Sequence, residues 1–107
     1  MDTVLADVRK ILGGEMVPNN FDPQIIIHIN TVLSISDQLS DILVKKVVDK
    51  DTVWEDIIPN IEENEAIKSY VGLKVKKMFD PPTSSVLMAS LDENIKELEW
   101  RIGVDSK

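Results

Sequence analysis

The sequence predicts an all-α protein, a small bundle of four main helices with a flexible or β-like arm between the second and the third. Apolar residues recur at three- and four-residue steps in several segments, which is the period of an amphipathic helix. Capping residues, prolines and glycines stand at the ends of these segments, where helices begin and stop. A chain of 107 residues buries roughly 60 to 70% of its unfolded surface. We therefore expect a single domain over residues 1–107.

The first helix is predicted over residues 3–12. Asp2 or Thr3 is suited to cap its start, and Gly13-Gly14 is suited to end it. Residues 13–20 contain Gly, Pro and Asn, which are typical of a loop. The apolar stripe of this helix consists of Val4, Leu5, Val8, Ile11 and Leu12.

The second helix is predicted to open at Phe21-Asp22-Pro23. Asp22 would be the N-cap and Pro23 the first helical residue, where its missing amide hydrogen has no cost. Three consecutive isoleucines at 25–27 also fit a strand, but the Asp-Pro start and the apolar spacing through Leu39 favour a helix. The apolar positions cover more than one face, so we expect this helix to be central in its domain or shared with a partner chain.

Residues 40–58 form the predicted arm. They combine β-branched residues with the pair Lys45-Lys46, a pattern that fits a helix extension, an extended arm or half of a hairpin. A single strand leaves its edges open, so a strand here would need a second one, including one from another subunit. Residues 52–58 predict one or two helical turns that place Trp54 and either Ile57 or Ile58 inward, with Pro59 at the end.

The third helix is predicted to start near Asn60 or Asn64 and to end at Asp80-Pro81. Its start is rich in Glu and its end in Lys, as the helix dipole favours. Gly72 in the interior costs about 1 kcal/mol relative to Ala, so we expect another helix to approach closely there.

The fourth helix is predicted over residues 86–102, followed by a flexible tail at 103–107. The doubled proline at 81–82 suits the first turn of this helix, with Asp, Thr or Ser before that turn as N-cap. The stripe residues are Leu87, Leu91, Ile95, Leu98 and Ile102. The third and fourth helices must pack on each other or on a neighbour to cover their stripes.

The residue types that usually serve catalysis or metal binding, such as Cys, His and paired acids, form no pattern here that predicts an enzyme, a cofactor or a metal site. The chain has no Cys and a single histidine, His28, inside the apolar part of the second helix. Glu62 and Glu65, together with acids of the last helix, invite comparison with helical pyrophosphohydrolases that bind Mg²⁺. The second half of that pattern fails, because the residue three positions after Glu93 is Lys96.

The charge of the chain bears on its partners. The net charge of −7 repels phosphate backbones and disfavours sequence-specific nucleic-acid binding, but it suits a protein past which DNA slides. The longest apolar run, Ile25-Ile26-Ile27, is far shorter than the roughly 20 residues of a membrane-spanning helix, so no membrane is expected as a partner.

Surface apolar residues are the strongest functional signal from the residues alone. Trp100 lies two positions after Leu98 and therefore off the stripe, so it either covers the edge of the core or anchors an interface. The candidate interface residues are Ile26, Val44, Val47, Trp54, Trp100 and Arg101.

Several motifs resemble one family. They are Phe21-Asp22 with Ile25-Ile26 and His28-Ile29-Asn30, the run Tyr70-Val71 to Leu73-Lys74-Val75-Lys76, the corner Phe79-Asp80-Pro81-Pro82-Thr83-Ser84-Ser85, and Glu97-Leu98-Glu99-Trp100-Arg101. Together they are similar to the small phage and prophage head–tail connector proteins, also called adaptor or head-completion proteins. The resemblance covers most of the chain outside residues 40–58.

The resemblance implies a structural virion protein at the head–tail junction, assembled in the cytoplasm of a bacterial host. It implies a homo-oligomeric ring of about a dozen copies that docks on the portal protein, receives a tail or stopper protein and continues the DNA channel. Genomic DNA would then be only a passing, non-specific contact. An alternative is an acidic helical protein that binds and regulates a host partner, for which we expect acids clustered on one exposed face.

Overall fold

The computed structural model describes residues 3–36, 39, 42–44, 47–59 and 65–105. The α-helices of this part are α1 (Val4–Leu12), α2 (Asp22–Ile35), α4 (Glu65–Phe79) and α5 (Ser85–Asp105). Single 3₁₀ turns lie at η1 (Gly14–Met16), η2 (Asn19–Phe21) and η3 (Trp54–Asp56). The described ranges contain no strand, only an isolated antiparallel bridge between Thr3 and Val53. The prediction of an all-α fold is confirmed.

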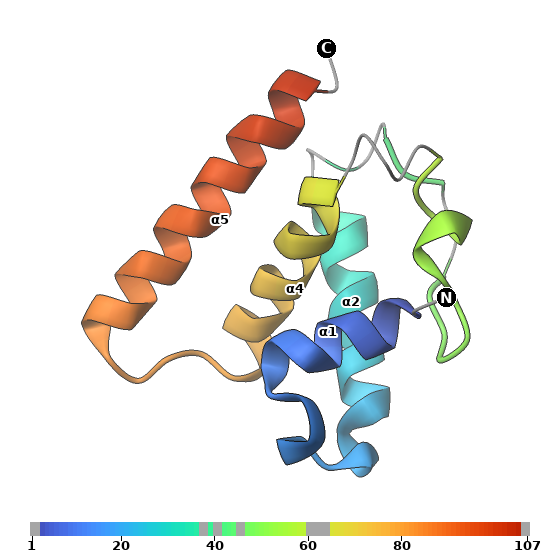
Figure 1. Ribbon diagram of the computed structural model, residues 1–107, viewed down its shortest axis with the longest axis horizontal. Coiled ribbons are helices and arrows are strands. Elements are labelled where there is room, and N and C mark those ends of the chain that lie inside the picture. Colours follow the sequence, from blue (N-terminus) through green and yellow to red (C-terminus); the bar gives the residue numbers. More distant parts are fainter. Residues whose placement is uncertain (1–2, 37–38, 40–41, 45–46, 60–64, 106–107) are drawn as a thin grey trace.

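The helix α4 is the centre of the fold. It packs against α1, α2 and α5, and Figure 1 shows α5 on one side of α4 and α2 on the other. Polar contacts show that α4 runs antiparallel to both neighbours. Its first half meets the end of α2 where Tyr70 contacts Ser36, and its last turn meets the first half of α5 where Lys77 contacts Asp92.

The helix α1 begins and ends as the sequence predicts. The Oγ1 atom of Thr3 accepts a hydrogen bond of 3.0 Å from the amide of Ala6, which identifies Thr3 as the cap. Gly13 ends the helix with φ of 133°, a conformation that residues with a Cβ rarely adopt. Its amide donates to the carbonyl of Arg9 at 3.1 Å.

The helix α2 differs from its prediction at both ends. Asp22 is already helical and Phe21 is in the capping position, so the prediction of Asp22 as N-cap was wrong. The carboxylate of Asp22 instead faces Arg9. The helix stops at Ile35 because Ser36 turns to extended backbone, although Leu39 beyond it is buried.

The segment 47–59 is held against α1 and α2. The Asn30 side chain donates to the Val48 carbonyl at 3.0 Å and accepts from the Val48 amide at 2.8 Å. The Val4 amide donates to the Thr52 carbonyl at 2.9 Å. The predicted helical turn is present as η3, and its inward residues Trp54, Ile57 and Ile58 are all buried. The predicted role of residues 40–58 as an arm toward a partner stays a prediction.

The third predicted helix corresponds to α4, and its two proposed caps, Asn60 and Asn64, lie outside the described residues. The predicted close approach at Gly72 is confirmed, because a Cβ built there would lie 2.1 Å from Cδ1 of Ile11 in α1. The chain leaves α4 at Phe79, and α5 begins at Ser85.

The linker between α4 and α5 contains the doubled proline. The prolines precede the first turn of α5 instead of forming it, which corrects the prediction. The Oγ atom of Ser84 accepts a hydrogen bond from the Leu87 amide at 3.4 Å, so Ser84 is in the capping position. Of the stripe residues, Leu91, Ile95 and Ile102 are buried.

Candidate interaction surfaces

The candidate interface residues fall in different environments. Trp54 is only 1% exposed, and its indole Nε1 donates to the Oδ2 atom of Asp7 at 2.7 Å, so it belongs to the core and presents almost no surface to a partner. Ile26 packs half-buried against the core. Val44, Val47, Trp100 and Arg101 are exposed.

The outward side of α2 forms an uncharged apolar surface, which we call the α2 edge. Its residues are Ile27, Thr31, Ser34 and Ile35. Ile27 and Ile35 are 61% and 63% exposed, although Ile25, Ile29 and Val32 on the opposite side are fully buried. The hydroxyls of Thr31 and Ser34 donate to backbone carbonyls of their own helix, at 2.9 and 3.0 Å. The predicted wide apolar arc of the second helix is therefore present and extends to the surface.

The outward side of α5 forms the second surface, which we call the α5 edge. Its residues are Val86, Ala89, Glu93, Lys96, Glu97 and Trp100, all of them exposed. Val86 and Trp100, near the two ends of the helix, are 75% and 70% exposed. The charged residues lie between them. Trp100 thus points away from the core and is not a cover for its edge.

Leu87 is a stripe residue of α5 that the structure leaves uncovered. It lies on the side that faces α4, yet it is 61% exposed. Lys77 in the last turns of α4 is level with Asp92, so the first turn of α5 extends past the end of α4 at Phe79. Nothing in α4 can therefore cover Leu87, which adds apolar surface beside the start of the α5 edge.

An aromatic cluster joins the start of α2 to the end of α4. The rings of Phe21 and Phe79 meet edge to face with centroids 5.6 Å apart, and the His28 ring lies 6.1 Å from that of Phe79. His28 is thus a packing residue at the rim of the core. The contact between the two phenylalanines is not predicted by the sequence pattern, although each belongs to a Phe-Asp-Pro tripeptide.

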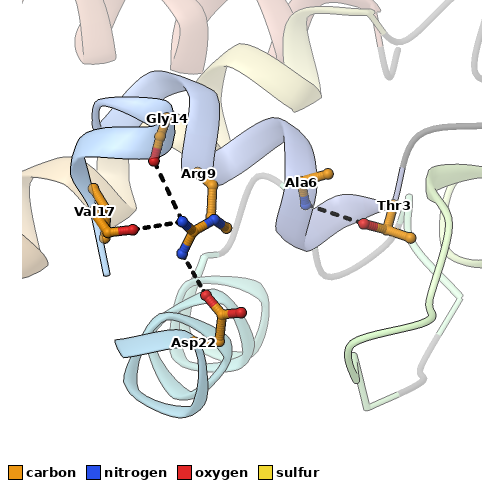
Figure 2. Close-up of polar contacts among 6 residues, drawn as sticks. All are labelled: Thr3, Ala6, Arg9, Gly14, Val17 and Asp22. Carbon is orange, nitrogen blue, oxygen red and sulfur yellow. Dashed lines mark hydrogen bonds and ion pairs between the residues drawn. The ribbon is translucent and has the colours of Figure 1, made fainter. Parts of the chain in front are cut away.

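Arg9 holds the loop after α1 to the start of α2, as Figure 2 shows. Its guanidinium donates to Asp22 Oδ1 at 2.5 Å and to the carbonyls of Val17 and Gly14 at 2.6 and 3.3 Å. The planar fork of an arginine suits several acceptors at once, which a lysine cannot match. This cluster could not be predicted from the sequence, because nothing in the spacing of Arg9 and Asp22 signals their contact.

Tyr70 is the buried polar group of the α4 interface. Its hydroxyl lies 3.2 Å from the Ser36 hydroxyl at the end of α2, and both residues are buried. Burial raises the pKa of Tyr70, the hydrogen bond with Ser36 lowers it, and the negative charge of Glu99 in α5 raises it further. This hydroxyl therefore joins α4 to the end of α2, within reach of the charge of Glu99 in α5.

The acidic residues do not gather into a reaction centre in the described part of the chain. Glu65 lies 3.7 Å from Lys68, and Asp92 lies 2.6 Å from Lys77, so each faces a cation. Glu62 lies outside the described residues. In those residues no group of three His, Cys, Asp or Glu side chains could hold a metal ion. None of the described helices combines the length and apolarity that crossing a bilayer requires.

The described part of the chain is a small all-α fold with exposed apolar side chains on the outward sides of α2 and α5. A family model described as phage connector protein matches residues 4–107. Because this match spans nearly the whole chain, the chain belongs to the phage connector protein family. This is a family of structural proteins, and its members are virion components. No curated protein and no solved structure matches the chain.

Proposed function

We propose that the chain is the subunit of a head–tail connector ring, which joins the portal protein to a tail or stopper protein and continues the DNA channel. The family match supports the connector role. The ring contains about a dozen copies, assembled in the host cytoplasm and retained in the virion.

Apolar surface on two different sides of one subunit is the observation that carries this proposal. The α2 edge and the α5 edge lie on helices that flank α4 (Figure 1). Contacts between two different surfaces of identical subunits are heterologous, and they close into a ring when the rotation between copies allows it. A monomer with a single apolar patch would only form a dimer or bind one partner.

The charge of the subunit fits a DNA channel. A net charge of −7 per copy, repeated around a ring, gives a wall that repels phosphate groups and lets the genome slide. The described acids are distributed over several elements, including Glu15 in η1, Glu55 in η3 and Glu93 in α5. The alternative of a regulator that mimics DNA predicts acids on one face instead.

The test is complementation of a phage that lacks this chain. We expect DNA-filled heads and free tails without the chain, and joined particles with a ring beneath the portal when the chain is supplied in trans. Electron microscopy of the purified particles provides both readouts. The proposal is wrong if heads join tails without the chain. It is also wrong if the chain is captured as a 1:1 complex with a host protein while virions form normally.

A further inference from the structure

We propose that neighbouring copies in the ring meet through the α2 edge of one copy and the α5 edge of the next. The helices α2, α4 and α5 run along the ring axis, Ile35 faces Trp100, and Ile27 faces Ala89. This contact rests on the proposed ring. Beyond the ring itself, the proposed contact specifies the two surfaces that meet and the heights at which their residues face each other.

The two edges point away from α4 in opposite senses. Along α5, Trp100 follows Leu98 by two positions, which turns it by about 200° around the helix axis from a side chain packed on the core. Along α2, Ile27 follows the fully buried Ile25 by the same two positions. Both helices pack on α4. Copies placed side by side thus continue one layer of helices in the order α5, α4, α2.

The relative heights of the edges follow from contacts with α4. Tyr70 is level with Ser36, and Lys77 is level with Asp92. Because α4 is antiparallel to both neighbours, each step along it is one step back along α2 and α5. Gly72 is therefore level with Ser34 in α2 and with Glu97 in α5.

The same heights bring apolar residues together in a ring. Rotation about the ring axis leaves heights unchanged. Ile35 lies at the height of Leu98, two residues or about 3 Å from Trp100. Ile27 lies at the height of Ser90, beside the small Ala89. The aromatic contact between His28 and Phe79 gives the same height of α2 along α4 independently, to within one residue.

Charge is compatible with this pairing. The α2 edge has no charged residue, so it does not oppose Glu93 and Glu97 of the next copy with like charge. These carboxylates instead lie at the level of the Thr31 and Ser34 hydroxyls. The apolar ends of both edges thus coincide, and so do their polar middles.

The size of the contact indicates that it is weak on its own. The 14 residues of α2 span about 21 Å, and a strip one helix wide, about 10 Å, covers on the order of 200 Å² of each partner. Stable interfaces cover about 800 Å² per partner. A single pair therefore associates weakly, and ring closure or docking on the portal must add stability.

Disulfide trapping tests the contact directly, because the natural chain has no cysteine. We expect the double variant Ser34→Cys/Glu97→Cys to give a ladder of cross-linked oligomers on oxidation, both at high concentration and on virions. Neither single variant should cross-link. The matched control is Ser34→Cys/Ser90→Cys, whose second cysteine lies about 10 Å lower on α5, too far for a disulfide.

Each result has one meaning. A ladder from the control but not from Ser34→Cys/Glu97→Cys overturns the register. A dimer from Glu97→Cys alone overturns the heterologous contact in favour of α5 pairing with α5. A ring on virions without any cross-link overturns the contact and leaves the proposed function standing, whereas heads that join tails without the chain overturn the proposed function itself.

Substitutions at the two edges give a second readout. We expect Trp100→Asp and Ile35→Asp each to weaken self-association by at least about tenfold, as for anchors of a small interface. The control Met16→Asp changes a strongly exposed residue outside both edges and should have no effect. Circular dichroism establishes that each variant is folded, and a folded Trp100→Asp variant that associates normally contradicts the proposal.

Discussion

The hydroxyl of Tyr70 joins α4 to the end of α2. The residue is buried in α4, bonded to Ser36 at the end of α2 and close enough to Glu99 of α5 for its charge to act on the ring. Ionisation of Tyr70 would place a negative charge in the interior beside an acid. The neutral form is therefore the one that the folded state favours.

This preference makes stability depend on pH in the alkaline range. The pKa of Tyr70 is raised above its usual value of 10.0, so above this pH the unfolded chain loses the proton first. The contribution of neutral Tyr70 to the free energy of unfolding is fully present below pH 10. This free energy falls as pH rises from 10 through the raised pKa. Urea unfolding at a series of alkaline pH values should show a steeper decline for the wild type than for Tyr70→Phe.

The absence of other tyrosines gives a direct control. Tyr70 is the single tyrosine of the chain, so tyrosinate absorbance reports its ionisation without overlap. Titration in the folded state should give a midpoint above that in denaturant. Coincident midpoints would show that burial does not affect this hydroxyl.

The two tryptophans show what sequence reasoning resolves for single residues. The position of Trp100 in the sequence fits both the edge of the core and an interface, and only the structure shows that it points outward. Trp54 was expected both to point inward and to serve an interface. In the structure Trp54 is buried, and its indole donates a hydrogen bond to Asp7, a residue far away in the sequence. Such contacts have no period that a sequence pattern could reveal.

At the level of elements, the crossing of α1 over α4 depends on Gly72. A Cβ at this position would lie 2.1, 3.3 and 3.6 Å from the Cδ1, Cγ1 and Cβ atoms of Ile11. The first contact is too short, whereas the last is ordinary. Ile11 must therefore move its side chain before any larger residue can replace the glycine.

A double-mutant cycle measures this constraint. In an Ile11→Ala background only the 3.6 Å contact remains, and Gly72→Ala should stabilise the protein by about 1 kcal/mol through helix propensity. In the wild-type background the gain should be smaller or reversed, because Ile11 must shift. Urea unfolding of the four proteins provides the values. Equal effects in both backgrounds would contradict the close approach.

Both ends of α1 and the direction of α4 were predictable from the sequence. Thr3, Gly13 and the Glu-to-Lys gradient of α4 act locally, so the chain itself encodes them. The end of α2 was not predictable, because the apolar spacing continues to Leu39 while Ser36 leaves the helix and meets Tyr70. The docking of segment 47–59 on Asn30 could not be predicted either. The Asn30 side chain bonds to the backbone amide and carbonyl of Val48, and such a contact leaves no pattern in the sequence.

For the whole molecule, two forces oppose each other when copies meet. A charge of −7 makes copies repel, whereas the exposed isoleucines, Val86 and Trp100 favour contact. Salt screens repulsion between exposed charges, with a Debye length near 10 Å at about 0.1 M and near 3 Å at 1 M. The balance should therefore shift with ionic strength.

We expect self-association to strengthen as salt rises from about 0.05 to about 0.5 M, which light scattering over a concentration series would detect. The variant Glu15→Lys/Glu55→Lys reduces the net negative charge at two exposed positions outside both edges. It should associate at lower salt than the wild type. Weaker association at higher salt would show that attraction between charges holds the copies together.

The all-α class and the connector family were predictable because they depend on helical periods, caps and motifs spread over most of the chain. The surfaces were only partly predictable. The width of the apolar arc in the second helix is encoded in its sequence, and Trp100 lies visibly off its stripe. The exposure of Leu87 could not be foreseen, since it depends on where α4 ends relative to α5.

The edge-to-face contact between Phe21 and Phe79 holds two chain reversals against each other through one pair of rings. One reversal leads into α2 and the other leads out of α4 toward the doubled proline. Damage to either ring would loosen both corners together. The start of α2 is thereby held to the end of α4 from which the linker to α5 leaves.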